Sequence, residues 1–376
     1  MKVCFCYTVP STLQFAVATV NKLKENGVDV VLISSDNDEL SKIAALLGIQ
    51  YYSVDFCRGY NIIADIKALY NLFRLFKTIR PDIVIGATPK AGLLSMISSM
   101  FAGVKKRIYH IFGFPFETSK GLVKALLVSI ERITAMCSTN VLPISQSIAD
   151  VCIENRLTRA RKLCRDYSLT IGGVDMDRFN PSIVNDEELR LQYQIQNNDI
   201  VVGFVGRITR DKGIYDFITV VKEINNCNVK YLIIGDNDAR VPVEDDLLNY
   251  IDNHENIIHI KYTDKIEKYY KLMNILLIPS YREGFGNANV EAQAMNIPVV
   301  CYNVTGCKDS VNDGVSGFLL PFQDVNRLTR TVELLINNQE QRAKMGVDAR
   351  QFVLDNFTTD KVAANNLEFI LKLSNV

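Results

Sequence analysis

The chain has 376 residues, of which 48% are hydrophobic and 22% charged, and its 42 Lys and Arg balance 42 Asp and Glu. This length predicts two domains rather than one core, and the zero net charge argues against a general nucleic-acid-binding protein. The charge is nevertheless uneven, because residues 1–180 carry 22 Lys and Arg against 15 Asp and Glu. Such a basic half is either a chance excess on solvated faces or the binding side for an anionic partner.

The cysteine and histidine content predicts neither a disulfide framework nor a metal site. The nine Cys form no C-x-x-C pair, and only three His are present. Cys4 and Cys6 alternate on a predicted strand at the very start of the chain, so we expect reduced thiols, no secretory signal and a cytoplasmic protein. The most apolar helical segment, Ala91 to Ala102, is too short to span a bilayer.

Apolar runs alternate with amphipathic helical stretches along the whole chain, which is typical of parallel α/β folds. The strands expected in the first half are Val3–Tyr7, Val28–Ile33, Tyr51–Val54, Ile83–Ile85, Arg107–Ile111 and Val141–Ile144. Those expected in the second half are Ile200–Val205, Val229–Ile234, Ile257–Ile260, Ile275–Ile278, Val299–Cys301 and Gly317–Leu320. A polar stretch, Asn180 to Asn198, reads as the linker. We therefore expect two Rossmann-like domains, 1–180 and 181–358, and a C-terminal helical segment, 359–376, long enough to pack back on the first.

The turn after Ile200–Val205 carries two cations. Gly206 and Arg207 close the strand, and Lys212 precedes the next helix. Because Arg forks onto phosphate oxygens and Lys supplies a point charge, the turn predicts a diphosphate site without a P-loop motif. The alternative is a pair of surface cations on a loop, and a second motif on the same sheet edge favours the site.

That second motif is Glu283-Gly284-Phe285-Gly286-Asn287-Ala288-Asn289-Val290-Glu291, which begins just after the strand Ile275–Ile278. Its glycines let backbone N–H groups approach an anion, and a helix N-terminus adds a favourable dipole. In an open parallel sheet, ligands bind at this edge. Glu283 in the turn and Glu291 about one helical turn later would reach the same ligand.

Four motifs occur in an order that points to one family. Besides Glu283 to Glu291, they are Gly206-Arg207 with Lys212-Gly213, Gly172 to Pro181, and Asp313 to Gly317. Together they resemble the E-x7-E signature, the phosphate-binding pair, the interdomain segment and the late Asp-Gly turn of retaining glycosyltransferase family 4. The resemblance covers most of the chain and implies the GT-B fold, in which two Rossmann-like domains face each other across a cleft.

The resemblance implies an enzyme that moves a sugar from a nucleotide diphosphate, expected to be UDP, to a saccharide acceptor, with retained anomeric configuration. Arg207 and Lys212 would bind the diphosphate, Glu283 the sugar and Glu291 the ribose hydroxyls. The implied donor-binding set is Gly206, Gly284, Phe285, Gly286, Asn287 and Glu291. The implied catalytic set is Glu283, Arg207, Lys212 and His110.

No metal or cofactor is expected, because fixed cations and a helix dipole already stabilise the departing diphosphate. Asp236-Asn237-Asp238 ends a strand nearby and could hold a divalent cation, but a polar turn is the simpler interpretation. The chain shows no clear carboxylate nucleophile, so departure and attack on one face of the sugar fit better than a double displacement.

The first half should bind the acceptor. Thr8 and Pro10 follow the first strand, where many family members carry a Gly-rich loop that this chain lacks. Lys90 opens the helix after Ile83–Ile85 and could meet an acceptor phosphate.

The segment Tyr109 to Glu117 resembles one in capsule and O-antigen transferases of the family, and it contains His110 and Gly113. His110 either contacts the donor sugar or acceptor hydroxyl, or is a strand-end His paired with backbone. The alternating Phe112, Phe114 and Phe116 form either a buried edge or an exposed patch for lipid.

Arg74, Lys77 and Arg80 recur at three-residue spacing between apolar residues. This stripe either suits an anionic membrane surface or is the wet face of an ordinary helix. If it is functional, the acceptor is a polyprenyl-diphosphate-linked saccharide used in surface polysaccharide synthesis, and the enzyme sits peripherally on the inner face of the plasma membrane. The alternatives to a transferase are a nucleotide-sugar epimerase of the same fold and a non-catalytic sugar-nucleotide-binding regulator.

Overall fold

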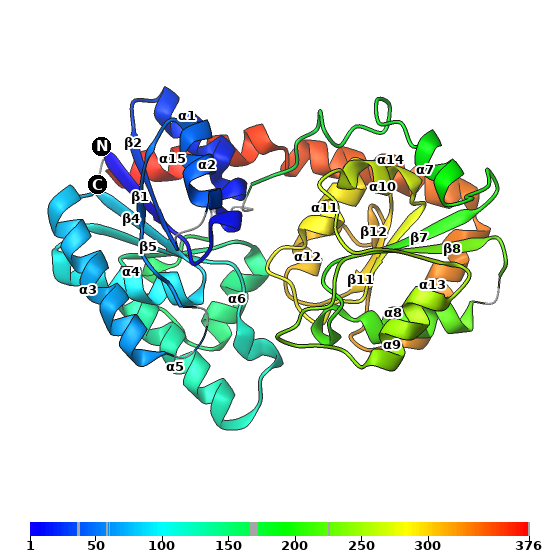
Figure 1. Cartoon of the computed structure of the whole chain (residues 1–376), viewed down its shortest axis with the longest axis horizontal. Coiled ribbons are helices and arrows are strands. Elements are labelled where there is room, and N and C mark those ends of the chain that lie inside the picture. The colour runs from blue at the N-terminus through cyan, green and yellow to red at the C-terminus, as the bar shows by residue number, and fades with distance from the viewer. Residues whose placement is uncertain (36–37, 58, 60, 166–171, 225, 375–376) are drawn as a thin grey trace. The chain divides into compact units, whose positions relative to one another are not determined.

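The computed structural model describes residues 1–35, 38–57, 59, 61–165, 172–224 and 226–374 (Figure 1). The chain forms two compact units, Met1–Gly173 with Thr359–Val376, and Val174–Thr358. The division thus falls after Gly173, whereas the sequence placed it after residue 180. Each unit contains one six-stranded sheet, and every strand pairing within the two sheets is parallel.

The sheet of the first unit has the strand order β3-β2-β1-β4-β5-β6. Its strands are β1 (Lys2–Cys6), β2 (Asp29–Ser34), β3 (Gln50–Ser53), β4 (Ile83–Ala87), β5 (Lys106–Ile111) and β6 (Asn140–Pro143). The central strands are buried over nearly their whole length, as expected for a parallel sheet covered on both faces. All six strands expected from the sequence are confirmed, with ends that differ by one or two residues.

Helices cover both faces of this sheet. They are η1 (Pro10–Ala16), α1 (Val17–Glu25), α2 (Asp38–Leu47), α3 (Ile62–Ile79), α4 (Pro89–Ala102), η2 (Pro115–Thr118), α5 (Gly121–Cys137), α6 (Gln146–Glu154) and η3 (Ala160–Lys162). Figure 1 shows α3, α4 and α5 on one side of the sheet and α1 and α2 on the other. Polar side chains cap two of these helices. The Asn61 side chain accepts from the N–H of Ala64 at the start of α3, and Ser145 caps α6, as expected from the sequence.

The C-terminal helix α15 (Thr359–Ser374) belongs to the first unit. It packs along α1, and the Asn366 amide donates to the Thr19 hydroxyl over 2.9 Å. Phe369 and Ile370 are buried in the core that contains Val3, Phe5 and other strand residues. Burial of these apolar side chains stabilises the helix against the unit that begins the chain.

The sheet of the second unit has the order β12-β11-β10-β7-β8-β9. Its strands are β7 (Ile200–Val205), β8 (Val229–Ile234), β9 (Ile257–Ile260), β10 (Ile275–Ile278), β11 (Val299–Tyr302) and β12 (Gly317–Leu320). Its helices are α7 (Glu187–Gln192), η5 (Arg210–Lys212), α8 (Ile214–Glu223), α9 (Asp245–Asn253), α10 (Ile266–Leu272), α11 (Asn287–Ala294), α12 (Cys307–Ser310), α13 (Val325–Asn337) and α14 (Gln339–Asn356). The strand order reverses beside β7, so β7 and β10 flank the topological switch point, where α/β sheets bind ligands.

Candidate functional site

The loops that follow β7 and β10 meet at the switch point of the second sheet. The two strands pair in parallel, with Ile275 opposite Val202, so their carboxyl ends reach the same edge. The Tyr281 N–H donates to the Asp211 carbonyl over 2.9 Å, which ties one loop to the other. This tie brings the predicted diphosphate turn and the predicted carboxylate motif together.

Lys212 and Glu283 form an ion pair across these loops. The ammonium lies 2.6 Å from Glu283 Oε1 and 2.8 Å from Oε2, and the Ser280 hydroxyl donates to Oε1 over 2.8 Å. The side chains are only 22% and 15% exposed, so solvent screens the pair weakly. The Glu283 N–H donates to the Thr305 carbonyl over 2.9 Å, which also fixes the backbone of the turn. The structure therefore brings the two predicted residues into contact with each other.

Two glycines of these loops have a left-handed backbone and no room for a side chain. Gly213 has φ +77°, and a Cβ there would lie 1.9 Å from the Pro279 carbonyl oxygen. Gly286 has φ +90° just before α11, and a Cβ there would lie 2.8 Å from both Asn289 Nδ2 and Ser310 Oγ. Any side chain would be strained at these angles and would push neighbouring atoms away. The amides of Gly286 and of Asn287, the first residue of α11, thus sit at a tightly packed helix N-terminus.

Phe285 contributes to the turn through its packing. Its side chain is 5% exposed and lies against the Phe357 ring, with centroids 5.0 Å apart in an edge-to-face arrangement. Only the backbone of Phe285 is therefore suited to a ligand, which agrees with the expected use of N–H groups around Gly284 and Gly286.

Arg207 lies just beyond the carboxyl end of β7, and its side chain is about half exposed. Its guanidinium bonds Asp238 Oδ2 at 2.5 Å, and Arg240 bonds both oxygens of that carboxylate. The bonds from Arg240, together with Arg207, hold the pKa of Asp238 well below its usual range. Both oxygens of Asp238 thus already accept from guanidinium groups. Gly206 precedes Arg207 and packs against Gly235. A Cβ added at Gly235 would lie 1.8 Å from the carbonyl oxygen of Gly206.

Glu291 lies on α11, on the side facing Tyr270. The Tyr270 hydroxyl donates to Glu291 Oε2 over 3.0 Å. Part of the residue remains exposed, but protein surrounds most of the carboxylate. This desolvation raises the pKa of Glu291 to about 7, although the hydrogen bond from Tyr270 acts to lower it. The carboxyl group is therefore poised to change its protonation state near neutral pH.

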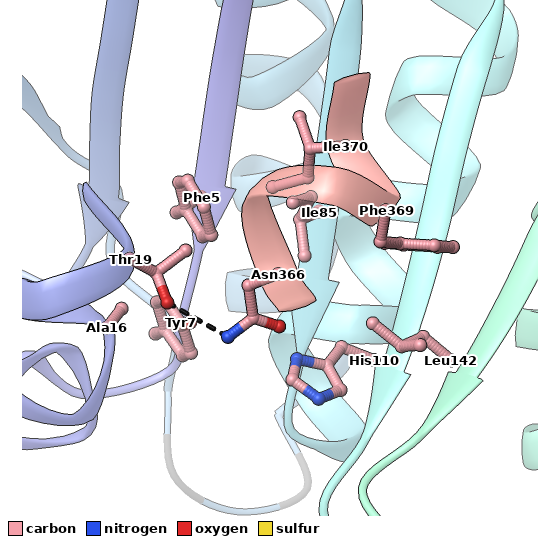
Figure 2. Close-up of a pocket in the computed structure, with 10 residues that line it drawn as sticks. All are labelled: Phe5, Tyr7, Ala16, Thr19, Ile85, His110, Leu142, Asn366, Phe369 and Ile370. Atoms are coloured by element: carbon pink, nitrogen blue, oxygen red, sulfur yellow. Dashed lines mark hydrogen bonds between the residues drawn. The ribbon is translucent and has the colours of Figure 1, made fainter. Parts of the chain in front are cut away.

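His110 lies at the carboxyl end of β5 in the first unit. Its ring meets the Phe112 ring edge-on at 4.6 Å, and burial lowers the pKa of His110 to about 3. Its Nε2 is buried and has no partner among the described residues. Figure 2 shows His110 beside Asn366 in a cavity closed by α15. The cavity has about 20 Å³, room for one water and not for a sugar. The imidazole is neutral at physiological pH, and this cavity gives it no contact with a saccharide.

The other predicted acceptor residues gather at the carboxyl ends of β1, β4 and β5. The Thr8 hydroxyl lies 2.6 Å from that of Thr88, and buried Pro10 begins η1. Lys90 is held by Asp65 at 2.8 Å and by the Gly59 carbonyl. Gly113 has φ +139°. Lys90 is thus already paired within the unit, and a phosphate would have to compete with Asp65 for it.

Burial answers the question left open for two of the three alternating Phe residues. Phe114 and Phe116 are 0% and 1% exposed, and their rings stack with centroids 4.7 Å apart. They form a buried edge rather than a lipid-binding patch.

Three site residues were not singled out from the sequence. They are Ser280 and Tyr270, which hold the two glutamates, and Arg240, which shares Asp238 with Arg207. Ser280 carried a usable signal, because it closely follows a buried strand. The roles of Tyr270 and Arg240 depend on contacts with residues that are distant or unmarked in the sequence, so the sequence carried no signal for either residue.

The chain matches two families and several characterised proteins. Residues 185–352 match the family described as glycosyl transferases group 1, and residues 2–142 match the family described as glycosyl transferase 4-like. The chain is 30% identical to the capsular polysaccharide biosynthesis glycosyltransferase CapM of Staphylococcus aureus, over 95% of this chain and 93% of that protein. It is 25% identical to the Escherichia coli UDP-Gal:alpha-D-GlcNAc-diphosphoundecaprenol alpha-1,3-galactosyltransferase, over 79% and 77% of the two chains.

The fold is shared with a solved structure over its full length. Anabaena Alr3699/HepE, solved in complex with UDP and glucose, superposes with a TM-score of 0.81, 17% identity and 100% coverage of both chains. At this identity the likeness concerns the fold, and it places the two six-stranded units among GT-B structures.

Proposed function

Because this chain belongs to the glycosyltransferases of group 1 and has the GT-B fold, we propose that it moves a sugar from a UDP-sugar to a lipid-linked saccharide in capsule or related polysaccharide synthesis. Family membership identifies a transferase, which argues against the epimerase and the non-catalytic regulator. The UDP donor is supported by the galactosyltransferase relative, whose name specifies UDP-Gal, and by the fold neighbour bound to UDP.

The donor would lie at the switch point of the second sheet. In this proposal the diphosphate contacts Arg207, Lys212 and the N–H groups at the start of α11, and Glu291 accepts from the ribose hydroxyls. The charge that develops on the leaving diphosphate is stabilised by these fixed donors, so the reaction runs without a metal ion. The single observation that carries the proposal is the contact of Lys212 with Glu283, because it brings a cation next to the carboxylate that we propose to bind the sugar.

Retention of the anomeric configuration would follow from attack on the face that the diphosphate leaves. The departing phosphate is then the base for the acceptor hydroxyl, and Glu283 accepts from the sugar hydroxyls. His110 takes no proton in this scheme, because burial keeps its pKa at about 3.

The acceptor would be a saccharide carried on a polyprenyl diphosphate. Support comes from the galactosyltransferase relative and from a Campylobacter jejuni relative, 21% identical, whose names both specify a diphosphoundecaprenol-linked acceptor. Among the described residues, no helix is long and apolar enough to cross a membrane. An enzyme with such an acceptor would work peripherally, at the inner face of the plasma membrane.

A transfer assay with a panel of nucleotide sugars tests this proposal. The purified chain is incubated with each donor and with short saccharides on undecaprenyl diphosphate, and products are identified by mass and anomeric proton coupling. We expect one UDP-sugar to give a product lengthened by one residue with the donor's anomeric configuration. Inverted products, or transfer from no donor of the panel, would contradict the proposal.

A further inference from the structure

The outer face of α5 carries a stripe of apolar side chains, here called the α5 stripe: Leu122, Leu126, Ile133 and Met136. They are 90%, 56%, 47% and 74% exposed and recur at helical spacing along one side of the helix. The single acidic residue of α5, Glu131, points inward, where the Tyr109 hydroxyl donates to it over 2.6 Å. A helix on a globular protein normally turns its apolar stripe to the core, and α5 exposes one to solvent.

Exposed apolar side chains also gather on the neighbouring helices of the same sheet face. They are Ile62, Ile63, Ile66 and Tyr70 on α3, and Met100 and Phe101 at the end of α4. Because α4 packs against both α3 and α5, these residues belong to one layer, seen on one side of the sheet in Figure 1. In the second unit, the large apolar side chains that are exposed lie singly on separate elements. The accumulation therefore belongs to one face of the first unit.

A groove rich in cations continues the α5 stripe at its C-terminal end. This basic groove is lined by Met136 together with Arg132, Arg156, Arg159, Arg161 and Lys162, and none of the described residues lining it is acidic. Lys162 donates to the carbonyls of Ala135, Met136 and Ser138, which fixes the groove against the end of α5. The Thr158 hydroxyl in the same lining is buried without a partner among the described residues.

We infer that the α5 stripe and the basic groove dock the first unit on an anionic lipid bilayer, an inference that rests on the proposed lipid-linked acceptor. Apolar side chains would enter the head-group layer, while the guanidinium groups contact lipid phosphates. A soluble phosphate compound could bind in the basic groove, but it would leave the α5 stripe exposed to water. A second copy that docked through this same surface would bring cations rather than acids to the groove. Only an anionic amphiphile matches both parts.

Sedimentation with lipid vesicles tests the docking surface. We expect the chain to bind vesicles containing about one third phosphatidylglycerol at least about tenfold more tightly than phosphatidylcholine vesicles, with binding that weakens as salt rises. The double variants Leu122→Ser/Leu126→Ser and Arg156→Glu/Arg159→Glu should each bind the phosphatidylglycerol vesicles about tenfold or more weakly than the unchanged chain. The matched control, Leu191→Ser/Val347→Ser, changes side chains that are 81% and 61% exposed in the second unit and should bind like the unchanged chain.

Several results would overturn the docking surface. They are equal binding to both kinds of vesicle, stripe variants that bind normally, and a vesicle-free dimer that the stripe variants convert to monomer. If only the Arg156→Glu/Arg159→Glu variant lost vesicle binding, and inorganic pyrophosphate fully displaced the unchanged chain from vesicles, the groove would be a site for soluble phosphate instead. With a short water-soluble acceptor, all variants should retain the transfer rate of the unchanged chain. If the unchanged chain transfers nothing, the proposed function fails, while its vesicle binding can still be measured.

Discussion

Glu283 and Lys212 hold each other in this structure, and the contact bears on how each would serve a donor. Two N–H groups of the ammonium go to the Glu283 oxygens, and no further acceptor among the described residues takes the third. That N–H remains suited to a phosphate oxygen. The two residues therefore act as one unit, in which a bound diphosphate would draw on Lys212 and leave the carboxylate able to accept from the sugar.

Glu283→Gln should lower kcat more than it lowers donor affinity. A hydrogen bond to a charged group contributes about 1.5–3 kcal/mol, so we expect kcat to fall roughly ten- to hundredfold while the Kd for UDP stays within about threefold. Steady-state kinetics and calorimetry measure the two quantities. Glu188→Gln, at an exposed position of α7, is the control. A normal kcat in Glu283→Gln would remove this residue from the site.

Donor affinity should depend on pH through Glu291. Its pKa is raised to about 7, so the carboxylate that accepts from ribose hydroxyls is lost as pH falls through this value. Affinity for a UDP-sugar, whose diphosphate does not titrate near pH 7, should therefore rise by about tenfold between about pH 6 and pH 8 and be nearly flat in Glu291→Gln. An unchanged pH profile in Glu291→Gln would show that another group causes the dependence.

At the scale of elements, the site depends on how closely the loops after β7 and β10 pack. Gly213 ends η5 and starts α8, and its Cα faces the carbonyl of Pro279, the residue directly after β10. The left-handed backbone at Gly213 and the contact with Pro279 place Lys212 against Glu283. We therefore expect a change at this glycine to affect both stability and donor binding.

Gly213→Ala should destabilise the second unit and weaken UDP binding. The left-handed backbone alone costs a residue with a Cβ about 1–2 kcal/mol, and the contact with Pro279 adds to it. Gly314→Ala is the matched control, because Gly314 has φ +74° and a Cβ added there would meet no atom within 4 Å. The urea midpoint should fall further in Gly213→Ala than in Gly314→Ala. Equal decreases of the urea midpoint in the two variants would show that the contact with Pro279 adds nothing to the destabilisation.

The sequence predicted the elements far better than the contacts between them. All twelve predicted strands are present, and those buried along their length follow from apolar runs, because a strand covered on both faces is apolar throughout. The pairing of Lys212 with Glu283 was not predicted, since it joins loops 71 residues apart. The burial of His110 depends on α15, from the far end of the chain. The α5 stripe was also missed, because an apolar stripe on a helix looks the same in sequence whether it faces a core or solvent.

In the whole molecule, the two units carry different surfaces, which the proposed reaction would use for its donor and its acceptor. The second unit holds the cations and carboxylates suited to a nucleotide sugar, and the first combines an apolar face with a basic groove. The groove supplies part of the basic excess of residues 1–180, within a chain that is neutral overall. It also agrees with an acceptor that has a lipid tail and a donor that does not.

Calorimetric titration with UDP in excess chelator tests whether Arg207 and Lys212 bind the donor diphosphate without a metal ion. The unchanged chain should bind UDP under these conditions, and Arg207→Ala and Lys212→Ala should each weaken binding about tenfold or more, because each removes a charge-assisted hydrogen bond. Binding that requires added Mg²⁺, or unchanged affinity in both variants, would show that these two cations do not hold the diphosphate by themselves.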